Sequence, residues 1–454
     1  MAIDENLHGN VSMNRIFSIS TIFTTLLLSL FALLPMQAQA GVNIEHWTAP
    51  SGARVYFVSS HALPILDVRI DFSAGTAYDP PGKSGVASLT NSLLDSGAKL
   101  GDVVLNEEQI AEKLADIAAN LGMSTDADRA GVGLRTLVAP KEREAALALM
   151  RAVLSAPTFP DEVLAREKVR SAAAIQEAET RPDSIAARRF QQAIYPNHPY
   201  GVVPTVASIG AITRDDVTTY WRTHFGAHRA VVSIIGDVTR AEAELIAARL
   251  TDALPDAPDA VMLPVVTSPA RIELRLPHPA MQSHIYIGLP AIKRGDADLF
   301  PLLVGNYVLG GGGFVSRLMK EVREKRGYAY SVYSYFDPRK LEGPFAIGLQ
   351  TKRAQAADAI KVVEATLDGF LKNGPTPQEL KAAQQNLVDG LALKLDSNAK
   401  ILGYLAVIGF YGLPLDYLDN YAHKVEAVTA QQVREAFARH VKPEHMVTVV
   451  VAAD

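Results

Sequence analysis

The pattern of apolar and polar positions divides most of the chain into two similar series of elements. Short apolar runs predict strands, and apolar residues at helical spacing predict amphipathic helices. The first series is expected to contain two strands and then two helices, at residues 55–59, 66–72, 85–96 and 106–121. The second is expected to repeat that order, with strands and helices at residues 271–276, 284–289, 298–309 and 314–325.

Both series continue with a long helix and close on a β-branched strand. One helix begins at Pro160 and reaches Ser184, and its counterpart begins at Pro377 and reaches Ser397. The closing strands are expected at residues 230–235 and 446–451. A repeat of about 215 residues indicates duplicated domains. Because neither series alternates strand and helix regularly, we expect an α+β fold, two duplicated domains that each have an antiparallel sheet with helices packed on it.

The first 40 residues have the pattern of a secretory signal. An apolar run over residues 16–34 follows Arg15, and the small-residue sequence Ala38-Gln39-Ala40 precedes Gly41. This pattern predicts cleavage before Gly41 and export to the periplasm. A retained membrane anchor is the alternative, because the run is long enough to cross a bilayer. We expect a signal peptide at residues 1–40 and a first domain at residues 41–255. A proline-rich linker at residues 256–268 then leads to a second domain at residues 269–454.

Composition narrows the possible partners and cofactors. The chain has 454 residues, 48% of them apolar, and a formal net charge of −5. It therefore lacks the basic surface that nucleic-acid binding requires. With no cysteine in the sequence, a metal site would need His, Asp or Glu ligands. After signal cleavage no further membrane segment is expected.

No single polar motif in this group is specific enough to indicate a function by itself. Gly310–Gly313 lacks the third glycine of a dinucleotide-binding loop and is interpreted as a mobile loop or a close backbone approach. His224 and His228 stand four residues apart, but the bend expected between them favours a surface or capping role. Asp126 and Asp128 alternate with Ala127 and are interpreted as the solvated edge of a strand.

Longer motifs are more specific. They are Gly75-Thr76-Ala77-Tyr78-Asp79-Pro80, the helix from Gly85 to Gly97, His198-Pro199-Tyr200-Gly201, and the segment from Leu309 to Val332. Together they resemble the pitrilysin/insulinase family of zinc metallopeptidases, M16, over essentially the whole mature chain. The resemblance implies the duplicated fold and a relationship to zinc-dependent peptide hydrolysis.

The zinc-binding residues of that family are missing here. Active members carry H-x-x-E-H on a helix, where two histidines bind zinc and the glutamate activates water. The matching positions hold Ser88, Asn91 and Ser92. The third ligand of the family lies seven residues after a glutamate that matches Glu167, where this chain has Ala174. The resemblance therefore implies no metal and no catalytic residue in this chain alone.

An Arg and a Tyr that the family carries in its second domain are retained as Arg323 and Tyr330. By the resemblance, they bind the peptide substrate near the scissile carbonyl. A guanidinium offers a planar set of donors, and a phenol can donate to a developing oxyanion. Without the family pattern, Arg323 would be one charge in a solvated run, and Tyr330 one of the tyrosines that alternate along a strand.

The function that follows is a non-catalytic subunit of a periplasmic, heterodimeric M16-type metallopeptidase. Its partner would be a homologous subunit that carries H-x-x-E-H and the zinc, and this chain would supply Arg323 and Tyr330 to a peptide substrate. The alternative is a catalytically dead peptide-binding or scaffolding protein that acts without a peptidase. An independent hydrolase has no nucleophile, metal set or acid pair in the sequence to support it. Peptide specificity, the partner's identity and self-association do not follow from the sequence.

Overall fold

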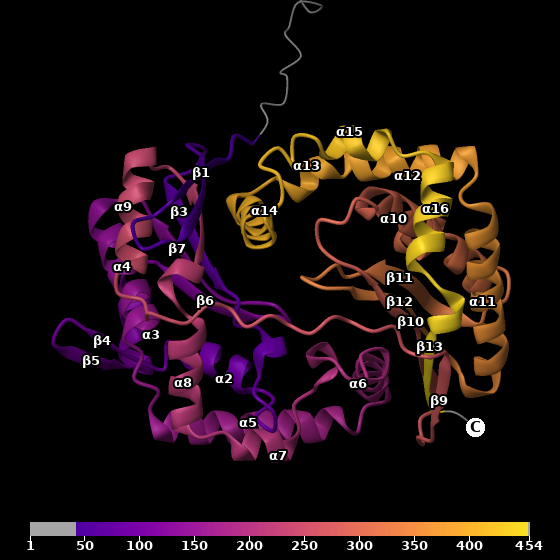
Figure 1. Ribbon diagram of the computed structural model, residues 1–454, viewed down its shortest axis with the longest axis horizontal. Helices are drawn as coiled ribbons and strands as arrows, with labels where there is room; N and C mark the ends of the chain where they lie inside the picture. The colour runs from indigo at the N-terminus through magenta and orange to yellow at the C-terminus, as the bar shows by residue number, and fades with distance from the viewer. Residues whose placement is uncertain (1–41, 453–454) are drawn as a thin grey trace, which may run out of the picture. The chain divides into compact units, whose positions relative to one another are not determined.

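The computed structural model describes residues 42–452, and residues from Asn43 onward form one compact unit. The expected signal peptide and its cleavage site lie outside the described residues. None of the described helices is both long and apolar enough to cross a membrane. We use "first half" for the elements from β1 to α9 and "second half" for those from β9 to β13 (Figure 1).

The first half is built on a sheet that has six strands among the described residues, in the order β1-β2-β8-β3-β7-β6. These strands are β1 (Glu45–Thr48), β2 (Arg54–Ser59), β3 (Ile65–Phe72), β6 (Asn120–Thr125), β7 (Ala130–Leu137) and β8 (Val231–Gly236), and a separate hairpin pairs β4 (Gly97–Leu100) with β5 (Val103–Asn106). The helices are α2 (Val86–Ser92), α3 (Glu107–Asp116), α4 (Pro140–Ser155), α5 (Asp161–Ala178), α6 (Pro182–Ile194), α7 (Val206–Ala211), α8 (Arg214–His224) and α9 (Arg240–Thr251).

The second half has a sheet of five described strands in the order β11-β12-β10-β13-β9. They are β9 (Ile272–Leu276), β10 (Gln282–Ile292), β11 (Ala329–Phe336), β12 (Gly343–Lys352) and β13 (Val447–Val451). The helices are α10 (Leu299–Asn306), α11 (Ala356–Asn373), α12 (Pro377–Asp389), α13 (Leu391–Lys394), α14 (Asn398–Tyr411), α15 (Tyr421–Glu426) and α16 (Ala430–His440).

The two sheets have the same topology, so the expected α+β fold with duplicated domains is confirmed. The order β6-β7-β3-β8-β2 in the first sheet corresponds strand for strand to β11-β12-β10-β13-β9 in the second. The expectation of antiparallel sheets needs one correction. Within the described part of the chain, β2 and β8 pair in parallel, and so do β9 and β13. In each sheet the closing strand inserts between two earlier strands, parallel to one and antiparallel to the other.

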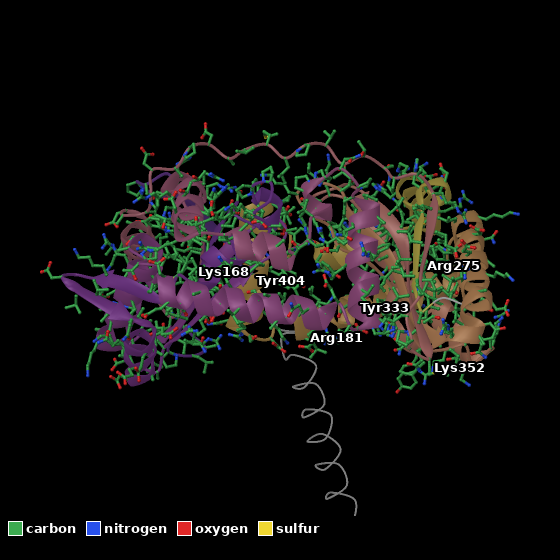
Figure 2. The ribbon with its side chains drawn as sticks, turned by 90° about the horizontal axis from the view of Figure 1, so that it is seen from below. Lys168, Arg181, Arg275, Tyr333, Lys352 and Tyr404 are labelled. Carbon is green, nitrogen blue, oxygen red and sulfur yellow. The ribbon has the colours of Figure 1, made fainter. Side chains whose placement is uncertain are left out.

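The long helix expected from residue 160 to residue 184 is two helices. The chain bends between α5 and α6 at Arg181, which is labelled in Figure 2, because Pro182 disfavours helical backbone at the residue before it. A similar interruption separates α13 from α14. These bends redirect α6 and α14, so that each helix packs against the sheet of the other half.

Helices α6 and α14 each cover one face of the sheet of the other half. On β8, Val232 and Ile234 belong to the core of the first half. Val231 points to the opposite face and meets α14 at Gly409. On β13, Val450 belongs to the core of the second half. Alternate β13 residues, with Val449 among them, pack with Phe190 of α6. Both closing strands are buried along their whole length for this reason.

The segment between the halves has no helix or strand over residues 255–271, as the proline-rich composition indicates. It is nevertheless packed against the protein. Ala257 is buried, and Leu263 contacts the cores of the first half and of the α6 interface. The ring of His198 also hydrogen-bonds the carbonyl of Pro264 through Nε2, at 2.9 Å.

Candidate functional site

Helix α2 carries Ser88, Asn91 and Ser92, the three positions that the resemblance matches to H-x-x-E-H. It begins after Gly85, whose positive φ of 106° is strained for residues with a side chain. The carboxylate of Asp79 accepts from the N–H groups of Gly85 at 2.7 Å and Ala87 at 2.8 Å and so caps the helix. Burial raises the pKa of Asp79 to about 6, although these hydrogen bonds oppose the shift.

Asn91, at the position expected to match the glutamate, forms a structural contact. Asn91 is buried, and its Nδ2 donates to the carbonyl of Ser124 at 2.9 Å and to that of Gly131 at 3.4 Å. These bonds tie α2 to β6 and β7. A glutamate carboxylate in this place could not donate to either carbonyl. The surroundings of residue 91 therefore suit an amide and not a carboxylate base.

The other positions offer weak ligands at best. Ser88 and Ser92 are exposed on α2, and the hydroxyl of Ser92 donates to the carbonyl of Leu89 at 3.0 Å. Ala174 is exposed on α5. Glu167 lies near two arginines, Arg166 and Arg170, at 3.4 and 3.7 Å. A set of serine, asparagine and alanine supplies no imidazole or carboxylate for tight zinc binding.

The structure brings Arg323 and Tyr330 together in the second half. Arg323 lies in the π-helical turn η6 (Met319–Glu324), and its guanidinium carbon lies over the ring of Phe314, 4.7 Å from its centroid, and over the ring of Tyr330, 4.9 Å from its centroid. Phe314 belongs to the 3₁₀ turn η5 (Gly313–Val315). The two aromatic rings hold the guanidinium in place and leave its N–H donors available.

The charges around Arg323 do not neutralise it. Glu321 pairs with Lys325 at 2.7 Å and Arg326 at 2.9 Å, and these contacts lower the pKa of its carboxyl. No carboxylate within residues 42–452 forms an ion pair with Arg323. Arg323 therefore differs from Lys325 and Arg326 and is available to an external carbonyl or carboxylate.

Tyr330 also differs from the other tyrosines of β11. The pairing of β11 with β12 shifts register between Ala329 and Val332, so the strand is irregular at Tyr330. Such an irregularity turns a side chain away from the regular alternation. Tyr330 is 84% exposed, against 40% for Tyr333. Tyr333, labelled in Figure 2, stacks on Tyr335 with ring centroids 6.2 Å apart.

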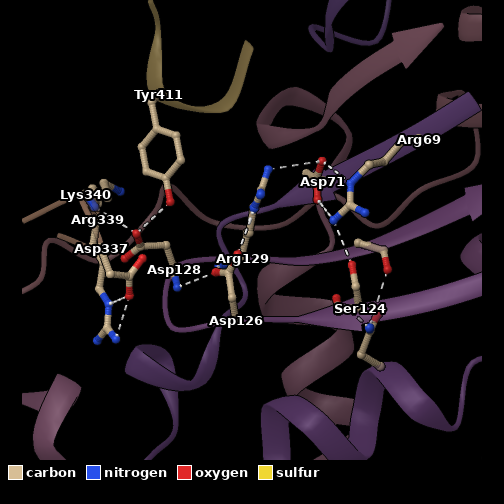
Figure 3. A network of polar contacts seen from close by, with 12 residues as sticks. Arg69, Asp71, Ser124, Asp126, Asp128, Arg129, Asp337, Arg339, Lys340 and Tyr411 are labelled. Carbon is tan, nitrogen blue, oxygen red and sulfur yellow. Dashed lines mark hydrogen bonds and ion pairs between the residues drawn. The ribbon is translucent and has the colours of Figure 1, made fainter. Parts of the chain in front are cut away.

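A buried carboxylate joins the two halves, contrary to the expectation of a solvated strand edge for Asp128. Asp128 is 1% exposed and accepts from the hydroxyl of Tyr411 at 2.9 Å and from the N–H of Lys340 at 2.8 Å (Figure 3). It also accepts from the hydroxyl of Tyr200. Tyr200 belongs to the first half, and Tyr411 and Lys340 to the second. Burial and the nearby Asp128 charge raise the pKa of both tyrosines.

The Asp128 contacts continue toward α2. Asp126 accepts from the N–H of Asp128 at 2.8 Å and from Nε of Arg129 at 2.9 Å. Arg129 then approaches Asp71 to 3.8 Å, and Asp71 is held by Arg69, which also donates to Ser124 (Figure 3). Because Asn91 bonds the backbone of Ser124, polar contacts run from the altered zinc helix to the contact between the halves.

One group of possible metal ligands occurs among the described residues, and it lies in the second half. Ligand atoms of Asp296, Asp298 and His440 come within 4.8 Å of one another. Asp298 is already paired with Arg439 through two contacts of 2.8 Å and with His440 at 2.9 Å. These contacts lower the pKa of Asp298, and they form an ion-pair network.

His224 is buried, which corrects the surface role expected for it. It is the last residue of α8, 7% exposed, and its ring lies 4.2 Å from that of Tyr220 and 5.7 Å from that of Tyr78. Burial, with a smaller contribution from Arg229, lowers its pKa to about 4. His228 is more exposed and lies 3.5 Å from Asp259. That His224 and His228 do not bind a metal ion together stays a prediction.

Sequence reasoning missed Phe314 and Tyr411, and it gave Asp128 an exposed position that the structure corrects. Phe314 follows four consecutive glycines, and an aromatic residue at such a loop could have been noted as a partner for Arg323. Asp128 and Tyr411 are 283 residues apart, and no local pattern indicates that they meet.

Two family models match the chain. One, described as insulinase (peptidase family M16), matches residues 54–203, and the other, described as the peptidase M16 inactive domain, matches residues 211–387. The chain is 28% identical over 437 residues to a protein of Helicobacter pylori named non-peptidase homolog YmxG, an alignment that covers 94% of this chain and 97% of that protein. It is 23% identical to an uncharacterized zinc protease, YmxG, of Bacillus subtilis, over 79% of this chain and 86% of that protein.

Solved structures have the same fold. A crystal structure described as the peptidase M16 inactive domain from Pseudomonas fluorescens is 35% identical, covers 91% of this chain and 98% of its own, and superposes with a TM-score of 0.86. A protease from Helicobacter pylori superposes with a TM-score of 0.81 at 18% identity, over 90% of this chain and 99% of that one. The second likeness concerns the fold alone.

Proposed function

Because the chain belongs to the M16, or insulinase, family of peptidases, we propose that it is a non-catalytic subunit that presents Arg323 and Tyr330 to a peptide in the active site of a zinc-bearing M16 partner. The observation that carries the proposal is the combination of an altered zinc helix with an intact Arg323–Tyr330 pair, in which Tyr330 is exposed and Arg323 is half-buried.

Each side chain has a separate role in this proposal. The guanidinium of Arg323, which lies over the two rings, donates to a backbone carbonyl or carboxylate of the peptide. The hydroxyl of Tyr330 donates to the oxygen of the scissile carbonyl as negative charge develops on it. Zinc bound in the partner supplies the activated water. The high exposure of Tyr330 supports a role toward another molecule.

The location of the complex is part of the proposal. The sequence of residues 1–41 has the features of a cleavable signal, and a periplasmic protease of Escherichia coli, PqqL, shares the fold at 16% identity. We expect the mature protein to be periplasmic and to begin at Gly41. Amino-terminal sequencing of the chain recovered from the periplasm tests this, and an intact Met1 or Met13 would contradict it.

The central experiment is reconstitution with a periplasmic homologue that carries H-x-x-E-H. Peptide cleavage should require both chains, and Tyr330→Phe should lower kcat/KM by ~10²–10³ without affecting association, because it removes one donor to the oxyanion. Arg323→Ala should also lower kcat/KM. Tyr333→Phe, on the same strand, is the matched control. Size-exclusion chromatography verifies that each variant still forms the complex.

Two results would contradict the proposal. Equal, small effects of the Tyr330 and Tyr333 substitutions would show that Tyr330 has no special role in the reaction. A homologue that cleaves peptides equally well without this chain would favour the scaffolding alternative.

We further expect the purified chain alone to bind no stoichiometric zinc and to cleave no peptide, because Ser88, Asn91, Ser92 and Ala174 cannot form the ligand set. Elemental analysis and a chelator-treated peptide assay test this. His440→Ala is the control for the Asp296–Asp298–His440 group, since any zinc held there would be lost in that variant. Zinc that persists in it, together with chelator-sensitive cleavage, would contradict the prediction.

A further inference from the structure

Ser59, His61 and Asp237 meet at the ends of two neighbouring strands of the first sheet. Ser59 is the last residue of β2 and pairs with Gly236, the last residue of β8. Asp237 follows Gly236 directly, and His61 lies two residues after Ser59. Because β2 and β8 are parallel, their carboxyl ends lie at the same edge of the sheet. The topology therefore brings together residues that are far apart in the sequence.

The three side chains are connected in the order of a Ser-His-Asp triad. The Oγ of Ser59 lies 3.1 Å from Nε2 of His61, and Nδ1 of His61 lies 2.5 Å from Oδ1 of Asp237. Since Asp237 accepts the proton of Nδ1, the lone pair of a neutral His61 is on Nε2 and faces the hydroxyl. This is the arrangement in which an imidazole acts as general base toward a serine. The hydroxyl also lies 3.4 Å from the carbonyl of Val238, a longer contact than that to His61.

The backbone around the triad is fixed. The N–H of Ser60 donates to the carbonyl of Gly236 at 2.9 Å, and that of Asp237 donates to the carbonyl of Ile65 at 3.1 Å. The Oγ of Ser60 donates to the side chain of Asn398 at 3.1 Å, so Ser60 has a separate partner. The loop that carries His61 is thus anchored on both sides, which favours a constant geometry of the triad.

We propose that Ser59, His61 and Asp237 form a serine acyl-transfer site that takes acyl groups from small, activated esters. Side-chain exposure of 71% for His61 and 37% for Asp237 leaves the site open to substrate and to water. A solvated site gives less electrostatic stabilisation than a water-excluded one. Esters with good leaving groups are therefore the substrates, and amides are not. This activity is independent of any zinc-bearing partner.

The reaction proceeds in two balanced steps. The Oγ of Ser59 attacks the ester carbonyl carbon, its proton passes to Nε2 of His61, and the bond to the leaving alcohol breaks as that oxygen takes the proton from Nε2. Water then attacks the acyl-enzyme and gives its proton to Nε2. The bond to Oγ breaks, the acid leaves, and Oγ recovers the proton. The N–H groups of His61 and Ala62 donate to no backbone acceptor within the described residues.

The test uses the full mature chain and a fluorophosphonate probe. Attack of Oγ on phosphorus expels fluoride and leaves a stable bond, so the labelled peptide can be found by mass spectrometry. We expect labelling at Ser59 that is lost in Ser59→Ala and kept in Ser60→Ala, the adjacent matched control. Hydrolysis of p-nitrophenyl acetate should fall by about 100-fold in His61→Gln, because the general base is removed. The loss in Asp237→Asn should be smaller than the ~10⁴ typical of a buried triad.

Circular dichroism confirms that each variant is folded. Labelling at another residue, equal labelling of Ser59→Ala, or no labelling of the wild-type chain would each overturn the proposal. Unchanged ester hydrolysis in His61→Gln would also overturn it, because Ser59 would then react without a base.

Discussion

At the scale of single residues, the environment of His224 makes a prediction about pH. The imidazole is buried against Tyr78 and Tyr220, and burial lowers its pKa from 6.5 to about 4. The unfolded chain therefore binds a proton more readily than the folded chain between these two pH values. The free energy of unfolding should therefore decrease as the pH falls below 6.5. Below pH 4 the loss from His224 is complete and amounts to about 3 kcal/mol.

The substitution His224→Phe keeps an aromatic ring and removes the titration. We expect the free energy of unfolding of the wild type, relative to that of the variant, to decrease from pH 7.5 to pH 4.5 in urea denaturation. The raised pKa of Asp79 has the opposite effect, a loss of stability as the pH rises toward 6, but it is common to both proteins. Parallel pH curves for the two proteins would contradict the prediction.

At the scale of elements, the packing of α14 on the first sheet depends on Gly409. A Cβ at this position would lie 2.7 Å from ring carbons of Tyr56 and 2.7 Å from Val231. The backbone of α14 therefore approaches the sheet too closely for any larger residue. At the reciprocal contact, a Cβ on Gly288 of β10 would lie 2.9 Å from Phe190 of α6, and closer still to the carbonyl oxygen of Phe345 on the neighbouring strand β12.

A pair of identical substitutions on α14 tests this contact. Gly409→Ala should destabilise the protein by about 1–3 kcal/mol, because it overpacks the interface. Gly403 lies on the same helix with no atom within 4 Å of a Cβ. Gly403→Ala should stabilise by up to about 1 kcal/mol through helix propensity. Urea denaturation measures both, and equal effects would contradict the close approach at Gly409.

At the scale of the whole molecule, Asp128 is expected to couple the unfolding of the two halves. Asp128→Ala would leave the hydroxyls of Tyr200 and Tyr411 and the N–H of Lys340 without their acceptor. A buried polar group without a partner costs about 1–3 kcal/mol. We expect a lower Tm and a broadened or split calorimetric transition, since the contact between the halves is weakened.

Tyr411→Phe is the control for this prediction, because it removes one donor and leaves the carboxylate with its other partners. Its effect should be about 1 kcal/mol, with a single transition. A wild-type Tm in Asp128→Ala would show that the Asp128 contacts contribute nothing to the joining of the halves.

Local pattern was sufficient to predict most of the elements. The strands at β2, β3, β9 and β13 agree with the expected apolar runs. β2, β3 and β13 are mostly buried, and their composition reflects that burial, whereas the residues of the edge strand β9 are exposed or half-buried. The position of α2, and with it the loss of the ligand residues, could also be predicted, since a ligand set is a property of residue type and spacing. The division of the long helix before Pro182 was not predicted, although a proline is a local signal for the end of a helix.

Contacts between distant residues were decided by tertiary structure. Residue identities alone predicted the absence of a zinc ligand set and pointed to Arg323 and Tyr330. Only the fold placed Phe314 against Arg323, gave Asp128 its partners from both halves, and set Asp237 beside His61 and Ser59. The physical reason is that hydrophobic periodicity specifies which face of an element is buried, whereas the parallel insertion of β8 and the exchange of α6 and α14 determine which faces and strand ends meet.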